Sequence, residues 1–126
     1  MELTAATILS LLLALTCLAT GAMKFSGHRV ARETPPHLGI GVGLYRLAGI
    51  LELLTAAGLV LAAIGVVPAW IGAAAGFGVA LLMVFAIRFH LRVGDPLIPR
   101  GPLDPAWGPS AVVLALGVLT GILVLL

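Results

Sequence analysis

Four stretches of the chain are almost entirely apolar, and each is long enough to cross a bilayer as a helix. They cover residues 3–23, 44–67, 69–89 and 109–126. A helix rises about 1.5 Å per residue and crosses the roughly 30 Å hydrocarbon layer in about 20 residues. Strands of a membrane β-barrel alternate apolar and polar positions, and these stretches do not. The pattern therefore predicts an all-α integral membrane protein, a four-helix bundle that forms one domain over residues 1–126.

The composition supports a membrane protein. Hydrophobic side chains make up 61% of the chain and charged ones 10%, and the mean hydropathy is +1.21. Soluble domains are about 45–50% apolar and about 25% charged, so this chain has too few charged side chains to cover a soluble fold. Disordered chains are poor in apolar residues, so the high hydrophobic content also excludes disorder. The single cysteine, Cys17, excludes a disulfide scaffold.

Three connections of unequal length join the four stretches. The second is a tight hairpin at Pro68. In the first, residues 24–43, segment 26–34 is expected to form a short interfacial helix that Pro35 and Pro36 end. In the third, residues 90–108, prolines recur with a period of three. That period predicts an extended polyproline II connector along the membrane surface. The prolines are Pro96, Pro99, Pro102 and Pro105.

The basic residues predict the orientation. All seven lie in the two long connections or at the adjoining helix ends: Lys24, Arg29, Arg32, Arg46, Arg88, Arg92 and Arg100. By the positive-inside rule, residues 24–43 and 90–108 face the cytoplasm, and both termini lie outside the inner membrane. The pI near 9.3 then describes a basic face that attracts anionic lipids, with no indication of nucleic-acid binding. Trp70 and Trp107 stand near opposite span ends, as interfacial anchors do.

Small residues recur at helical spacing on the last two spans. Gly72, Gly76 and Ala80 share one face of the third span, and Gly117 and Gly121 share one face of the fourth. Such stripes let helix backbones approach closely in lipid. Packing within the bundle is the favoured interpretation, and a homodimer through Gly72/Gly76 or Gly117/Gly121 is the alternative.

Glu52 is the most informative polar residue. It lies about 12 Å along the second span from Leu44, where an ionisable group costs several kcal/mol unless it is paired or neutral. Ala48, Gly49 and Ala56 share its helix face, so Glu52 is expected to point at a neighbouring helix.

Several residues are candidates to partner Glu52. Arg46 lies six residues away on the same helix, about 120° around it, so a partner from another helix is favoured. Lys24 and Arg88 are the preferred candidates, while His90 and Tyr45 complete the predicted ligand- or proton-binding set. Two interpretations stay open: a structural ion pair that locks the bundle, or a carboxylate that binds protons or a ligand in a cavity facing the cytoplasm.

The histidines do not predict a metal site. His28, His37 and His90 fall in the long connections with Glu33, but without a recognised ligand spacing. The two prolines at 35–36 are expected to prevent Glu33 and His37 from sharing a helix. No catalytic residue, metal or resident cofactor is therefore predicted.

Three segments resemble a known family. The first span ends in Gly-Ala-Met-Lys-Phe at 21–25, the second carries Tyr-Arg-Leu-Ala-Gly-Ile-Leu-Glu-Leu at 45–53, and the third ends in Arg-Phe-His-Leu-Arg at 88–92. In this order and spacing they resemble the DoxX and DoxX-like proteins, which are small four-helix membrane proteins. The polar residues that match the pattern are Lys24, Arg46, Glu52 and His90.

The resemblance implies an association with membrane redox chemistry. One relative is a subunit of thiosulfate:quinone oxidoreductase, and others assemble with superoxide dismutase and a sulfurtransferase. The first hypothesis is therefore an accessory subunit without catalysis of its own. It would bind a cytoplasmic or membrane redox enzyme, with room for a quinone or lipid between its helices. The alternatives are a small proton-coupled transporter that uses Glu52, and a quinone-reactive oxidoreductase subunit.

Overall fold

The computed structural model describes residues 3–126. Within this range the chain forms five helices: α1 (Ala5–Met23), α2 (Arg29–Leu38), α3 (Val42–Ala63), α4 (Ala69–Arg92) and α5 (Gly108–Leu125). All except α2 are long and apolar enough to cross a membrane. The chain is therefore an all-α, multi-pass membrane protein, as its hydrophobic pattern predicts.

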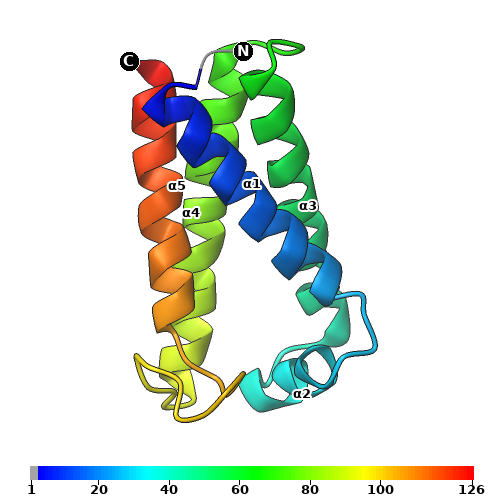
Figure 1. Cartoon of the computed structure of the whole chain (residues 1–126). Helices are drawn as coiled ribbons and strands as arrows, with labels where there is room; N and C mark the ends of the chain where they lie inside the picture. Colours follow the sequence, from blue (N-terminus) through cyan, green and yellow to red (C-terminus); the bar gives the residue numbers. More distant parts are fainter. Residues whose placement is uncertain (1–2) are drawn as a thin grey trace.

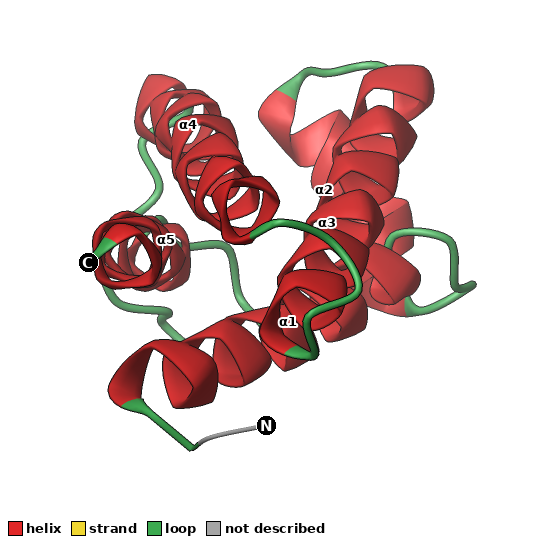
Figure 2. Ribbon diagram, turned by 90° about the horizontal axis from the view of Figure 1, so that it is seen from above, coloured by secondary structure: helices red, strands yellow, loops and turns green. Residues whose placement is uncertain are grey.

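The four long helices form a closed ring. Helices α4 and α5 run side by side, whereas α1 crosses diagonally from α5 to α3 (Figure 1). Viewed from above, the order around the ring is α4, α5, α1, α3, and α3 packs back on α4 (Figure 2). We call the end that carries α2 and residues 93–107 the loop end. The opposite end, with the α3–α4 hairpin and the C-terminus, is the terminal end.

Most of each span faces outward. Only 17–33% of the residues in each span are buried inside the bundle, and large apolar side chains such as Leu15, Leu54 and Leu81 are exposed. Lipid is the solvent that accommodates such a surface. The interior is a small core from three of the helices, made of Leu13, Ala14, Cys17, Ala56, Leu59, Val79 and Met83.

Helices α4 and α5 touch through glycine. A Cβ atom on Gly76 would lie 2.8 Å from the Gly117 carbonyl oxygen, and one on Gly117 would lie 2.6 Å from the Gly76 carbonyl oxygen. The Phe77 ring packs on Gly121, and Gly72 faces Ala62 of α3. The prediction that these stripes pack the bundle is confirmed. A homodimer through the same glycines would require α4 and α5 to separate.

Two span boundaries differ from the predicted ones by more than two residues. Helix α3 ends at Ala63 because Gly65 adopts a left-handed conformation (φ 81°). The amides of Val66 and Val67 donate back to the Leu61 carbonyl at 2.9 and 3.3 Å. This turn is apolar, so hydropathy alone does not separate it from the helix. Helix α4 continues to Arg92 and includes His90.

The predicted end of the interfacial helix is wrong. Helix α2 runs through Pro35 and Pro36, and Gly39 (φ 69°) ends it instead. The Pro35 and Pro36 carbonyls accept hydrogen bonds from Ile40 and Gly39 at 3.0 and 3.2 Å. A proline removes its own N–H bond, but its carbonyl still accepts, so a helix held by other contacts can continue. Glu33 and His37 consequently share α2, contrary to expectation.

The predicted polyproline II connector is also wrong. The chain reverses at residues 101–104, where the Asp104 amide donates to the Gly101 carbonyl at 3.1 Å and Leu103 has a φ of 62°. It then returns to its own beginning, since the Trp107 amide donates to the Pro96 carbonyl at 3.0 Å. Gly101 followed by Pro102 favours such a turn. The period of three in the proline positions does not exclude it.

The glycine contact between α4 and α5 can be tested with a matched pair of variants. In Gly76→Ala, the added methyl group meets backbone of α5, and overpacking of this kind costs about 1–3 kcal/mol. We expect a lower midpoint of thermal unfolding in detergent micelles. Gly78→Ala on the same helix adds a methyl group that contacts nothing within 4 Å. Equal destabilisation by both substitutions would contradict this packing.

Candidate functional site: a buried lysine–glutamate pair

Glu52 is buried in α3 and paired with a lysine. The residue is 2% exposed, and its Oε1 lies 2.6 Å from Lys24 Nζ. Lys24 directly follows α1, so the ion pair joins the end of α1 to the middle of α3, on the face that also carries Gly49. Of the two preferred partners, Lys24 is the one that the structure shows.

Local packing explains why these two side chains meet. A Cβ atom on Gly21 would lie 2.9 Å from the Gly49 carbonyl oxygen, and one on Gly49 would lie 3.1 Å from Lys24 Cβ. The two glycines therefore allow α1 and α3 to cross at backbone contact. Lys24 and Glu52 lie within one turn of this crossing, so neither side chain needs to extend across a wide gap.

The second carboxylate oxygen also has a partner. The Thr20 hydroxyl donates to Glu52 Oε2, and Thr20 lies on α1 one turn before Lys24. The ammonium group stands 5.4 Å from the centre of the Tyr45 ring, within the range of a cation–π contact. Tyr45 is itself buried. Both charges are therefore neutralised and hydrogen-bonded inside the bundle.

The remaining predicted site residues lie elsewhere. Arg46 and Arg88 are exposed and form no ion pair within residues 3–126. His90 bonds Asp95 and not Glu52. The structure thus brings together Glu52, Lys24 and Tyr45 from the predicted set, adds Thr20, and leaves the other three outside.

A second polar cluster, which sequence reasoning missed, joins α2 to the end of α4. His37 Nε2 and His90 Nδ1 donate to the two oxygens of Asp95 at 2.7 and 2.6 Å. We call these three residues the clasp. Arg92 adds a 3.3 Å hydrogen bond to the Leu38 carbonyl, so α2 is held to α4 by both polar contacts.

The end of α4 explains the clasp. Gly94 (φ 78°) and Asp95 donate their amides to Leu91 and His90 at 3.1 and 3.0 Å. This is a Schellman turn, which folds Asp95, the third residue after α4, back over His90, five positions earlier. The spacing His-x-x-x-Gly-Asp was the available signal, because glycine at that position places the aspartate beside the histidine.

The environment of Asp95 changes its acidity. Burial raises the pKa of Asp95, but the hydrogen bonds and positive charge from His90 and His37 lower it by more. The pKa of Asp95 therefore lies below its ordinary value of 3.8. The two histidines of the clasp therefore favour the ionised form of the Asp95 carboxyl group.

The loop end is strongly basic. Lys24 is paired, but the six arginines are exposed and none forms a salt bridge within residues 3–126. The exposed carboxylates at this end are Glu33 and Asp104. The surface charge that a partner or a lipid headgroup meets here is therefore positive.

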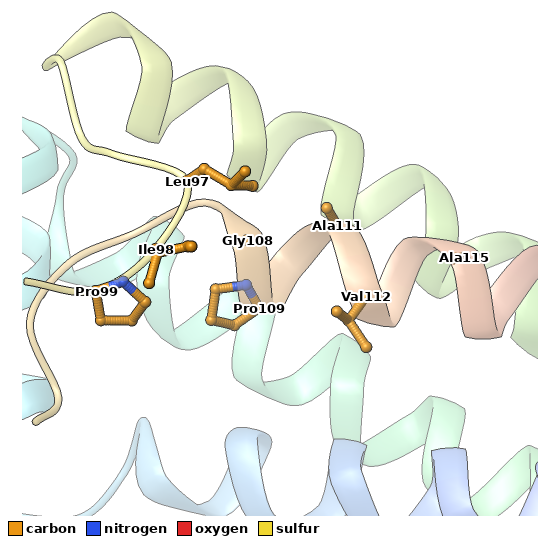
Figure 3. A pocket seen from close by; sticks show the side chains of 8 residues that line it. All are labelled: Leu97, Ile98, Pro99, Gly108, Pro109, Ala111, Val112 and Ala115. Atoms are coloured by element: carbon orange, nitrogen blue, oxygen red, sulfur yellow. The ribbon is translucent and has the colours of Figure 1, made fainter.

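Two surface grooves lie at the loop end. A polar groove runs between α2 and residues 103–105, and an apolar one runs between residues 97–99 and α5 (Figure 3). Within residues 3–126, no three His, Cys, Asp or Glu side chains are placed to hold a metal ion.

Comparison with known proteins finds one relationship. The model of the DoxX-like family matches residues 8–120, a range that includes the Lys24–Glu52 pair and the clasp. No curated protein and no solved structure matches the chain.

The clasp predicts an acid-dependent stability. Because the folded pKa of Asp95 lies below its unfolded value of 3.8, its contribution is complete above that pH and is lost as the pH falls through the folded pKa. We expect the thermal midpoint in micelles to drop on acidification below about pH 4. Asp95→Asn should lower the midpoint at pH 6 and weaken its further fall. An acid profile unchanged by this substitution would show that Asp95 does not stabilise the fold.

Proposed function

The chain belongs to the DoxX-like family, and from this premise we propose that it is a non-catalytic accessory subunit of a membrane redox system that binds its partner at the basic loop end. The observation that carries the proposal is the set of exposed arginines that form no salt bridge within residues 3–126. Arg92 holds their surface together through its hydrogen bond to the Leu38 carbonyl. The redox assignment of the partner is supported by the resemblance to DoxX-type proteins that the sequence carries.

Rigidity favours a docking role for this surface. Helix α2 carries Arg29 and Arg32 and is fixed to α4 by the clasp. A preorganised surface loses less conformational entropy when it binds than a flexible loop does. Clustered positive charge also accelerates encounter with an acidic partner and excludes a basic one.

The buried pair supports a scaffold in preference to a transporter. Glu52 is held by Lys24 and Thr20 at once, so its negative charge is already balanced within the bundle. A carboxylate that exchanges protons against substrate would have to release this lysine in every cycle. The pair is better suited to fixing the crossing of α1 and α3.

We further propose that the loop end faces the cytoplasm. All seven basic residues lie at that end, and the hairpin at 64–68 has none. The excess of Lys and Arg in short loops sets the orientation of membrane proteins.

The orientation can be measured by thiol labelling in intact cells. The native Cys17 is 1% exposed, so only an introduced cysteine reacts with the reagent. We expect Val66→Cys in the hairpin to react with an impermeant maleimide in intact cells. Gly27→Cys, before α2, should react only after permeabilisation. The reverse pattern would place the loop end outside.

Partner binding is tested by affinity purification from native membranes in mild detergent, followed by mass spectrometry. We expect the double variant Arg29→Glu/Arg32→Glu to recover a redox-enzyme partner at least about tenfold less well, because its glutamates repel an acidic partner and each ~1.4 kcal/mol of lost affinity is a factor of about ten. Arg29→Lys/Arg32→Lys is the matched control that keeps the charge. Equal recovery by both variants, or recovery of the bait alone, would contradict the proposal.

A further inference from the structure

The polar groove at the loop end lies between two separate parts of the chain. One wall is a face of α2, and the other is the segment 103–105, which belongs to the loop that reaches α2 at the bottom of Figure 1. The volume of the groove is about 340 Å³. Both walls contribute charged or titratable side chains to its lining: Arg29, Glu33 and His37 from α2, and Asp104 from the segment.

Both walls are held in place by hydrogen bonds. Helix α2 is fixed to α4 through the clasp, to which His37 belongs. In the opposite wall, the Asp104 amide donates to the Gly101 carbonyl at 3.1 Å, and the Trp107 amide donates to the Pro96 carbonyl at 3.0 Å. The groove therefore persists without a ligand, and a ligand that enters it has little chain to order.

The charges that line the groove do not neutralise one another. Arg29, Glu33 and Asp104 are exposed, and none of them forms a salt bridge within residues 3–126. His37 uses its Nε2 atom for Asp95, so Arg29 is the permanent cation of the groove. Charges of both signs that line one groove without meeting are complementary to a ligand that carries a negative and a positive group.

The groove lies at the level of the lipid headgroups. Its wall ends at Pro105, three residues before Gly108, the first residue of the span α5. Trp107 stands between them, and tryptophan favours the interface between lipid and water. The negative group that a ligand brings to this level is therefore well matched by phosphate.

The side chains of the groove also suit these two groups individually. Arginine binds phosphate oxygens through paired N–H groups, and carboxylates accept strong hydrogen bonds from an ammonium group. We propose that the groove binds a phosphoethanolamine group, with its phosphate at Arg29 and its ammonium group between Glu33 and Asp104. The site goes beyond the proposed function, because it takes a small ligand in the absence of any partner protein.

Isothermal titration calorimetry of the full chain in dodecyl maltoside micelles at neutral pH tests this site. The two probes are glycerophosphoethanolamine and glycerophosphocholine, which share the phosphodiester. The quaternary ammonium of choline has no N–H group to donate to Glu33 or Asp104. We expect glycerophosphoethanolamine to bind about tenfold more tightly, which is the effect of one hydrogen bond to a charged group.

Three variants assign the contacts. Glu33→Gln/Asp104→Asn should abolish the preference for ethanolamine, whereas Arg29→Gln should weaken the binding of both probes. Arg32→Gln is the matched control, since Arg32 is exposed on the same helix but does not line the groove, and it should change neither affinity. Arg32 belongs to the surface proposed to bind a partner, so this control also separates the two proposals. All three variants replace exposed side chains, and circular dichroism checks that their helix content is unchanged.

A third probe, dihexanoylphosphatidylethanolamine below its micellar concentration, identifies the source of the group. Tighter binding than that of glycerophosphoethanolamine supports the site as one for a lipid headgroup, and equal binding supports it as one for a soluble phosphodiester. The proposal is overturned if neither headgroup compound binds, or if both bind equally. It is also overturned if the preference survives Glu33→Gln/Asp104→Asn, or if Arg32→Gln weakens binding as much as Arg29→Gln does.

Discussion

A carboxylate inside an apolar bundle must be neutralised, and this requirement organises the protein. Glu52 is 2% exposed and obtains its counter-charge from Lys24, at the end of a different helix. The pair can form only where α1 and α3 approach to backbone contact, which Gly21 and Gly49 permit. The diagonal path of α1 across the bundle leads it to this crossing (Figure 1).

The loop end follows from that crossing and from two glycine-terminated helices. Once α1 and α3 are fixed, the short segments on either side of α2 hold it at the loop end. Gly39 and Gly94 turn the chain where α2 and α4 end. The turn at Gly94 brings Asp95 against His90, and His37 completes the clasp. The result is an ordered, positively charged surface beside an apolar groove.

The sequence was sufficient for the spans and for the importance of Glu52, because both follow from the cost of exposing polar groups to lipid. It also narrowed the preferred partners of Glu52 to Lys24 and Arg88, since few cations were within reach, and the structure shows Lys24 as the partner. It did not predict that α2 continues through Pro35 and Pro36. A proline in the sequence shows which backbone hydrogen bond a helix loses, but not the tertiary contacts that compensate for the loss. The clasp was missed for a related reason. Its members lie on two connections, and only the turn at Gly94 brings Asp95 to His90.

The central claim is that Lys24 and Glu52 stabilise the bundle as a pair. A double-mutant cycle with Lys24→Met and Glu52→Gln tests it most directly, with free energies of unfolding measured in mixed micelles at neutral pH. Each single variant leaves one buried charge or polar group without its partner, so the double variant should be far less damaged than the sum of the two. We expect a coupling energy of about 2–3 kcal/mol, whereas additivity within about 0.5 kcal/mol would contradict the account.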